Sequence, residues 1–165
     1  MVLLVLLTIA KPQISHAQDY LPHKKDGKFG FVNGSGQWVV NPVFDRVGHF
    51  KNKIAYGIIH DSLFLINANN SKRFISGVRN MEIVDSNAFL LQNNEGKWAI
   101  TDSTLKTISD YKYSKIKMVN GYFLVYQGGL FGVLDKNGKE MLPVENSYGK
   151  FIMSNLFLAV VNKEK

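Results

Sequence analysis

Cysteine is absent from the sequence. Its absence excludes disulfide bonds, thiolate metal sites, cysteine nucleophiles and a lipidated lipoprotein cysteine. No window of the chain shows a clear amphipathic helical pattern. The composition is 45% hydrophobic and 20% charged, which is typical of a globular domain and not of a disordered chain.

The common sequence motifs of catalysis are also missing. The chain has no G-x-S-x-G nucleophile elbow, no phosphate-binding P-loop and no H-E-x-x-H motif. Acidic residues are few, and nothing in their order points to the carboxylate pair of a glycosidase. We therefore predict that the protein is not an enzyme and uses no cofactor, with a hydrolase as a distant alternative.

Metal-binding patterns are equally weak. The four histidines are dispersed, and only His49 and His60 are close enough to face each other. Zinc needs three or four convergent ligands, so we predict ordinary surface histidines and no metal site. The segment DKNG at Asp135 resembles the start of a calcium loop but lacks the later ligands, which indicates a hairpin turn.

The chain is basic, with 20 Lys and Arg against 13 Asp and Glu and a formal net charge of +7. Such a charge suits nucleic acid, an anionic membrane surface or an acidic polymer. However, the lysines are scattered, and Lys24-Lys25 is the one pair of adjacent lysines. A nucleic-acid binder would carry a dense basic stripe or an aromatic-basic motif, so we predict no nucleic-acid binding.

The N-terminus resembles a secretory signal. Residues 2–10 read VLLVLLTIA, an apolar run too short to span a bilayer, and no lysine or arginine precedes it. Ser15 and Ala17 occupy the −3 and −1 positions of a cleavage site. We predict a signal peptide at 1–17, a short leader at 18–24, no transmembrane span, and export to the periplasm, outer surface or medium. A buried N-terminal strand is the alternative.

An internal repeat organises the rest of the chain. Short apolar alternations begin at four lead positions separated by 34, 35 and 33 residues: Phe29, Leu63, Trp98 and Phe131. A second column is separated by 34, 35 and 35 residues: Phe44, Val78, Tyr113 and Tyr148. A polar third column consists of Asn52, Asn87, Asn120 and Asn155. The shared period predicts four tandem units near 25–58, 59–92, 93–126 and 127–165.

Within a unit the apolar residues alternate with period 2 and surround Asn/Asp/Gly turns, which predicts antiparallel hairpins. Pro42 and Pro143 are expected to end the second strand of their hairpins. Gly30 and Gly132 follow a lead ring and are expected to allow close backbone approach by a neighbouring unit. The predicted fold is an all-β tandem array of about four antiparallel units, either propeller-like or an open solenoid.

This unit resembles the WG repeat, a motif written as GKWG followed by a strand, a turn and a proline-aromatic-acid segment. The resemblance rests on DGKFGFVNGSGQWVVNPVFD, EGKWAITDS and GGLFGVLDKNGKEMLP, and covers roughly residues 25–165. Tryptophan leads only at Trp98, where Ala99 replaces the following glycine. The resemblance implies a β-rich structural array and transfers no catalytic residue.

Two features favour binding. Arg46, Lys115 and Lys150 share one repeat position, with Asn80 in the second unit, and could form a basic ladder for an acidic protein, polymer or glycan. Trp38, Tyr111 and Tyr126 could instead form a sugar-stacking platform. Solvent-facing strand residues and ordinary packing are the simpler readings of both. The sequence thus predicts an exported, non-enzymatic binding module, with carbohydrate recognition as the alternative.

Overall fold

The computed structural model describes residues 20–153 and 156–160, and side chains up to residue 147. The predicted signal peptide and its cleavage site lie outside these residues. All regular structure in the described part is β, as predicted, and the strands form five antiparallel sheets. Within each sheet, strands that are consecutive in the sequence pair with each other, because short turns join them.

The sheets are numbered here from the N-terminus. Sheet 1 contains β1 (Leu21–Lys25), β2 (Lys28–Val32) and β3 (Trp38–Phe44). Sheet 2 contains β4 (Arg46–Val47), β5 (Ile54–Ile59), β6 (Ser62–Asn67) and β7 (Lys72–Ile75). Sheet 3 contains β8 (Val78–Ile83), β9 (Ala88–Asn93), β10 (Trp98–Asp102) and β11 (Thr107–Tyr113). Sheet 4 contains β12 (Lys115–Val119), β13 (Tyr122–Gln127), β14 (Leu130–Leu134) and β15 (Glu140–Asn146). Sheet 5 contains β16 (Tyr148–Met153) and β17 (Leu156–Val160).

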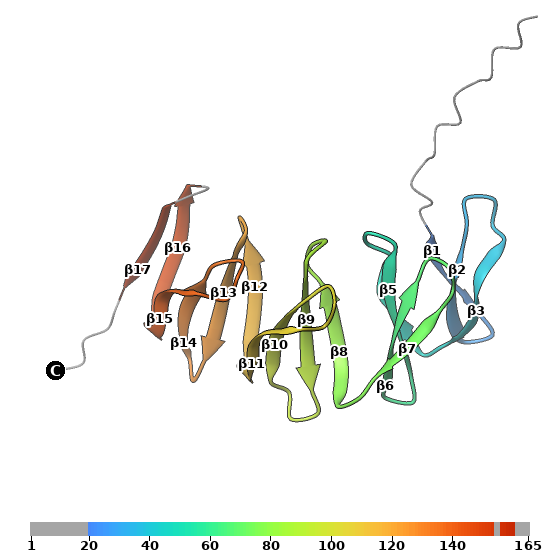
Figure 1. The fold of residues 1–165 in the computed structure, drawn as a ribbon, viewed down its shortest axis with the longest axis horizontal. Coiled ribbons are helices and arrows are strands. Elements are labelled where there is room, and N and C mark those ends of the chain that lie inside the picture. Colours follow the sequence, from blue (N-terminus) through green and yellow to red (C-terminus); the bar gives the residue numbers. More distant parts are fainter. Residues whose placement is uncertain (1–19, 154–155, 161–165) are drawn as a thin grey trace, which may run out of the picture.

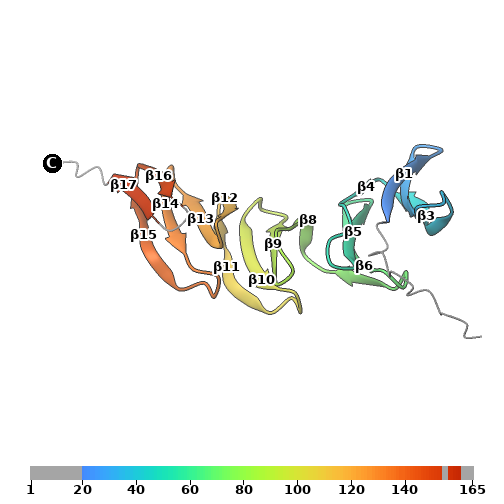
Figure 2. The same cartoon turned by 90° about the horizontal axis from the view of Figure 1, so that it is seen from above.

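The sheets follow one another in an open row, with sheet 1 at one end and sheet 5 at the other (Figure 1). The described residues therefore form an open array and not a closed propeller. Seen from above, β4, β8, β12 and β16 lie along one long side of the row, which we call the first-strand side (Figure 2). The last strands of sheets 1 to 4 lie along the opposite side, the fourth-strand side: β3, β7, β11 and β15.

The sheets and the sequence units have the same period but a different phase. Sheets 1 and 3 end at a second-column residue, Phe44 and Tyr113, whereas sheets 3 and 5 begin at one, Val78 and Tyr148. The proposed unit ends at 58, 92 and 126 fall within β5, β9 and β13. A tandem repeat can be divided at any phase, so each four-stranded sheet combines two strands from one unit with two from the next.

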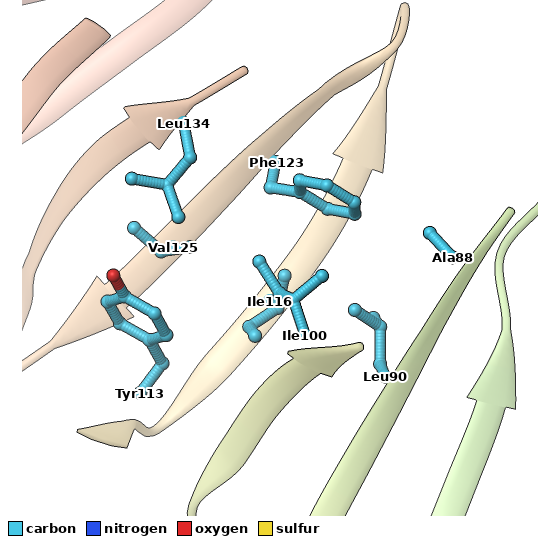
Figure 3. Packing of buried hydrophobic residues seen from close by; sticks show 8 residues of the cluster. All are labelled: Ala88, Leu90, Ile100, Tyr113, Ile116, Phe123, Val125 and Leu134. Atoms are coloured by element: carbon cyan, nitrogen blue, oxygen red, sulfur yellow. The ribbon is translucent and has the colours of Figure 1, made fainter. Parts of the chain in front are cut away.

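Three apolar cores lie between successive sheets. Sheets 1 and 2 enclose Tyr20, Phe31, Val40, Phe44, Ala55 and Ile66. Sheets 2 and 3 enclose Ile58, Leu63, Leu65, Val78, Met81, Phe89 and Leu91. Sheets 3 and 4 enclose Ala88, Leu90, Ile100, Tyr113, Ile116, Phe123, Val125 and Leu134, whose side chains meet between the two sheets (Figure 3). No sheet could bury both faces alone, so packing between neighbours stabilises the row.

The predicted columns contribute unequally to these cores. The second column is fully packed where it is described, since Phe44, Val78 and Tyr113 are at most 6% exposed. In the first column Leu63 and Phe131 are buried, whereas Phe29 and Trp98 are half-buried. Of the third column, Asn52 and Asn120 have φ near 50° in exposed turns, a conformation that asparagine tolerates well. The side chains of Tyr148 and Asn155 lie outside the described part.

The predicted role of proline was wrong. Pro42 lies inside β3 and Pro143 inside β15, and both strands continue past the proline to the sheet boundary. The ladder tolerates them because both strands are edge strands and carry a register shift, a β-bulge, at that place.

The predicted role of the glycines also needs correction. A Cβ on Gly30 would lie 2.3 Å from the Val40 carbonyl oxygen, and one on Gly132 would lie 2.7 Å from the Leu142 carbonyl oxygen. These atoms belong to the bulged strand paired directly with the glycine, not to a neighbouring sheet. The glycines therefore make room for the bulge within their own sheet.

Candidate binding surface

The first-strand side carries an excess of basic residues. The first strands of sheets 2, 3 and 4 contain one acidic residue, Glu82, and four basic residues: Arg46, Arg79, Lys115 and Lys117. The fourth-strand side is balanced, with Lys72, Arg73 and Lys112 against Asp110, Glu140 and Glu145. The edge strands of the first-strand side therefore carry more positive charge than those of the fourth-strand side.

Strand register places the predicted ladder residues at equivalent positions. Arg46, Asn80 and Lys115 each lie opposite a second-strand residue that in turn lies opposite the lead residue of that sheet. Arg46 and Lys115 are exposed and form no ion pair with any described residue. The Lys115 Nζ lies 6.0 Å from the ring centroid of Tyr126, within cation–π range. Lys150 belongs to β16 on the same side, and its side chain is outside the described part.

Sheet 2 interrupts this side with a short first strand. After Arg46 and Val47 pair with β5, Gly48 donates its N–H to the Tyr56 carbonyl oxygen, and the chain then leaves the ladder until Lys51 pairs with Ile54. The two residues between Gly48 and Lys51 differ in burial. Phe50 packs edge-on against Phe31 with centroids 4.7 Å apart, whereas His49 is exposed.

Two adjoining cavities lie where the ladder is interrupted. One, of about 370 Å³, is lined by residues of sheets 1 and 2: Pro22, Phe29, Arg46, Val47, His49, Tyr56 and Ile58. The other, of about 350 Å³, is lined by residues of sheets 2 and 3: Val47, Gly48, His49, Phe50, Lys51, Tyr56, Glu82 and Ile83. The cavities share Val47, His49 and Tyr56, and we call the pair the Tyr56 groove. No motif in the sequence indicates this groove.

The phenol of Tyr56 is held in place by close packing. A Cβ on Gly48 would lie 2.2 Å from the Tyr56 ring, so the absence of a side chain at Gly48 allows the ring to lie there. Burial raises the pKa of the Tyr56 phenol, and the nearby Arg46 guanidinium partly offsets that rise. At neutral pH Tyr56 is a neutral group that can donate and accept hydrogen bonds next to a fixed cation.

A larger cavity of about 500 Å³ lies between sheets 3 and 4, with the side chains of Asp102, Lys106 and Lys136 among its lining. The carboxylate of Asp102 already accepts hydrogen bonds from the backbone N–H groups of Thr104 and Lys106. These bonds and the Thr104 hydroxyl lower the pKa of Asp102. The Asp102 carboxylate is thus used by its own turn, and both acidic and basic residues line the cavity. This cavity is therefore less suited to an acidic partner.

The other candidate residues do not converge. Among the described residues no group of three or more His, Asp or Glu could hold a metal ion. The side chain of Asp135 accepts N–H groups from Asn137 and Lys139, so DKNG forms a hairpin turn. The aromatic residues Trp38, Tyr111 and Tyr126 belong to three different sheets, and Tyr126 packs against Phe131.

Residues 29–56 match the family model described as WG containing repeat. This segment of the chain is therefore similar to a WG repeat. The matched segment begins at the first lead residue and ends at Tyr56, so it runs from β2 of sheet 1 through β5 of sheet 2 and includes most of the Tyr56 groove. No curated protein matches the chain. Among the described residues there is no helix long and apolar enough to cross a membrane.

Proposed function

We propose that this chain is a WG-repeat protein and serves as an exported, non-enzymatic binding module that receives an acidic partner along its first-strand side. The observation that carries the proposal is the charge asymmetry of the two long sides, four basic and one acidic residue against a balanced set. Repeat arrays present extended surfaces, and regularly spaced cations along one of them suit an extended anion.

The export part of the proposal is supported by the sequence of residues 2–17. An apolar run of nine residues followed by Ser15 and Ala17 fits a secretory signal with its cleavage site. N-terminal sequencing of the protein recovered from its own host tests this. A mature chain beginning at Gln18 supports export, and a chain that still begins at Met1 contradicts it.

The binding part is tested with a charge-reversal variant. We expect Arg46→Glu, Lys115→Glu and Lys150→Glu together to weaken binding to immobilised polyglutamate or dextran sulfate by at least about tenfold at low salt. Lys72→Glu, Arg73→Glu and Lys112→Glu together make the same change in net charge on the fourth-strand side, so this variant is the matched control.

The two variants separate a directed surface from general basicity. Equal weakening by both triple variants means that only net charge matters and contradicts the proposal. Binding that survives the first triple reversal also contradicts it. Equally strong binding to neutral dextran favours carbohydrate recognition instead.

A further inference from the structure

The Tyr56 groove differs from the rest of the first-strand side because it combines a cation with a concave apolar wall. Pro22, Phe29, Val47 and Ile58 line the cavity between sheets 1 and 2, and Arg46 is its one Lys or Arg. Cavities of a few hundred cubic ångströms with apolar walls and a few polar groups are typical ligand sites. A flat basic surface selects charge alone, whereas this cavity can also select shape.

The polar groups of this cavity are not engaged elsewhere. Neither the Arg46 guanidinium nor the Tyr56 hydroxyl hydrogen-bonds to any described residue. Arginine binds carboxylates through two parallel N–H donors, and the neutral phenol can donate a further hydrogen bond. Together they form a recognition pair for one carboxylate at the mouth of an apolar cavity.

The second cavity gives the groove a direction. It is lined by Glu82 as well as Lys51, and Lys51 is already engaged, because its Nζ donates to the backbone carbonyl oxygens of Ile83 and Val84. Lys51 keeps its positive charge and offsets Glu82 in the second cavity, whereas no described acidic residue lines the first cavity, so Arg46 attracts a carboxylate to that side of Tyr56. Since the two cavities share Val47, His49 and Tyr56, a peptide segment can lie across both.

We propose that the Tyr56 groove binds an acidic peptide segment in which a large apolar side chain is adjacent to the carboxylate residue. The carboxylate pairs with Arg46 and Tyr56, and the apolar side chain enters the cavity walled by Phe29 and Ile58. This inference rests on the proposed function, because it names the kind of acidic partner that the first-strand side receives. The groove lies at sheet 2, whose first strand has two residues, whereas the first strands of sheets 3 and 4 have six and five.

The test uses three acetylated and amidated hexapeptides, Gly-Ser-Asp-Phe-Ser-Gly, Gly-Ser-Asp-Gly-Ser-Gly and Gly-Ser-Lys-Phe-Ser-Gly, titrated calorimetrically into the full chain. We expect the Asp-Phe peptide to bind at least about tenfold more tightly than either other peptide, because it alone satisfies both the cation and the apolar wall. Arg46→Gln should remove about tenfold of that affinity, and Tyr56→Phe about fivefold.

Arg79→Gln is the matched control, since Arg79 is an exposed arginine on the first strand of sheet 3 and hydrogen-bonds to Gln92 outside the groove. It should weaken peptide binding far less than Arg46→Gln does, because Arg79 does not line the groove. Both groove variants should fold, because Arg46 is exposed and Tyr56→Phe preserves the ring. Thermal melts of each variant check this.

The outcomes separate this inference from the proposed function. Equal binding of the Asp-Phe and Asp-Gly peptides, or an equal effect of Arg46→Gln and Arg79→Gln, overturns the groove while leaving the acidic-partner surface intact. Absence of peptide binding in a protein that still binds polyglutamate also overturns it. Loss of polyglutamate binding in the fourth-strand control variant would count against the proposed function alone.

Discussion

Sheets 2 and 4 follow the same four-strand plan but differ at both edges. In sheet 4 the first strand, β12, has five residues and the last, β15, has seven with a bulge; in sheet 2, β4 has two residues and β7 has four with a regular register. Both sheets nevertheless keep packed faces. The comparison teaches that faces in a stacked array must match their neighbours, whereas edges are free to change and so can carry function.

The residue after the lead position explains the difference at the fourth strand. Gly30, Ala99 and Gly132 are small, and in their sheets the lead residue and the next core residue pair with the same bulged register. Phe64 holds this position in sheet 2, where β6 and β7 pair without a shift. A large side chain cannot lie beneath a bulge whose carbonyl oxygen points at the Cβ position.

The largest expected effect comes from filling that position. Gly132→Val should destabilise the protein by about 3 kcal/mol, because its Cβ would meet the Leu142 carbonyl oxygen, which belongs to the backbone and cannot rotate away. Phe64→Val places the same side chain at the equivalent position of sheet 2. It should reduce the free energy of unfolding by less than half as much as Gly132→Val. Urea unfolding measures both, and equal losses would contradict the assigned role of the bulge.

A second expected effect concerns the turn before the fourth strand. One position of this turn has positive φ in sheets 1 to 4, and it is occupied by Gly36, Asn70, Leu105 and Gly138. Leu105 is the exception, with φ 73°, and its side chain packs against the core between sheets 2 and 3. Leu105→Ala loses the packing and keeps the strain, whereas Leu105→Gly loses the packing and relieves the strain. Thermal unfolding should therefore show the glycine variant more stable than the alanine variant by about 1 kcal/mol.

A smaller effect is expected at acidic pH, at the boundary of sheets 1 and 2. The Lys28 side chain, paired with Asp45, and the His60 N–H, 2.9 Å from the Asp45 carboxylate, lower the pKa of Asp45. A lowered pKa stabilises the folded state at pH values above the pKa of Asp in the unfolded chain, about 3.9. That stability is lost as pH falls through the pKa of the folded state. The stability gap between wild type and Asp45→Asn should shrink from pH 6 to pH 2, and parallel curves would show that the pair contributes nothing.

The smallest effect is expected at alkaline pH and sharpens the description of sheet 2. Burial raises the pKa of Tyr56, so the folded state holds the phenolic proton more tightly than the unfolded state does. The stability that the neutral phenol contributes is fully present below the pKa of Tyr in the unfolded chain, about 10. It is lost as pH rises through the pKa of the folded state. Tyr56→Phe should reduce this alkaline loss between pH 9 and 11. Some loss should remain, because burial also raises the pKa of Tyr111.

Local signals in the sequence predicted the elements of the fold well. Period-2 alternation and Asn/Asp/Gly turns indicated hairpins, and the side chains of Asp102 and Asp135 indeed accept N–H groups of their own turns. The second column was buried wherever it is described. These features depend on neighbours within a few residues, which the sequence displays directly.

Features that depend on distant pairs were harder to predict. Pro42 and Pro143 were expected to end strands, because a sequence does not show that a bulge on an edge strand accommodates them. Arg46 and Lys115 were identified as equivalent from spacing alone. The Tyr56 groove was not found, because it depends on where β4 leaves the ladder and on the ring of Tyr56 lying over Gly48.

The sequence by itself determined the all-β class, the repeat period and the buried second column, because these follow from periodicity and turn chemistry along the chain. Tertiary structure decided the phase of the sheets, their open row, the place of each bulge and the groove at Tyr56. Those properties arise where backbones of different strands meet, and a contact such as that of Gly132 with Leu142 exists only after the strands have paired.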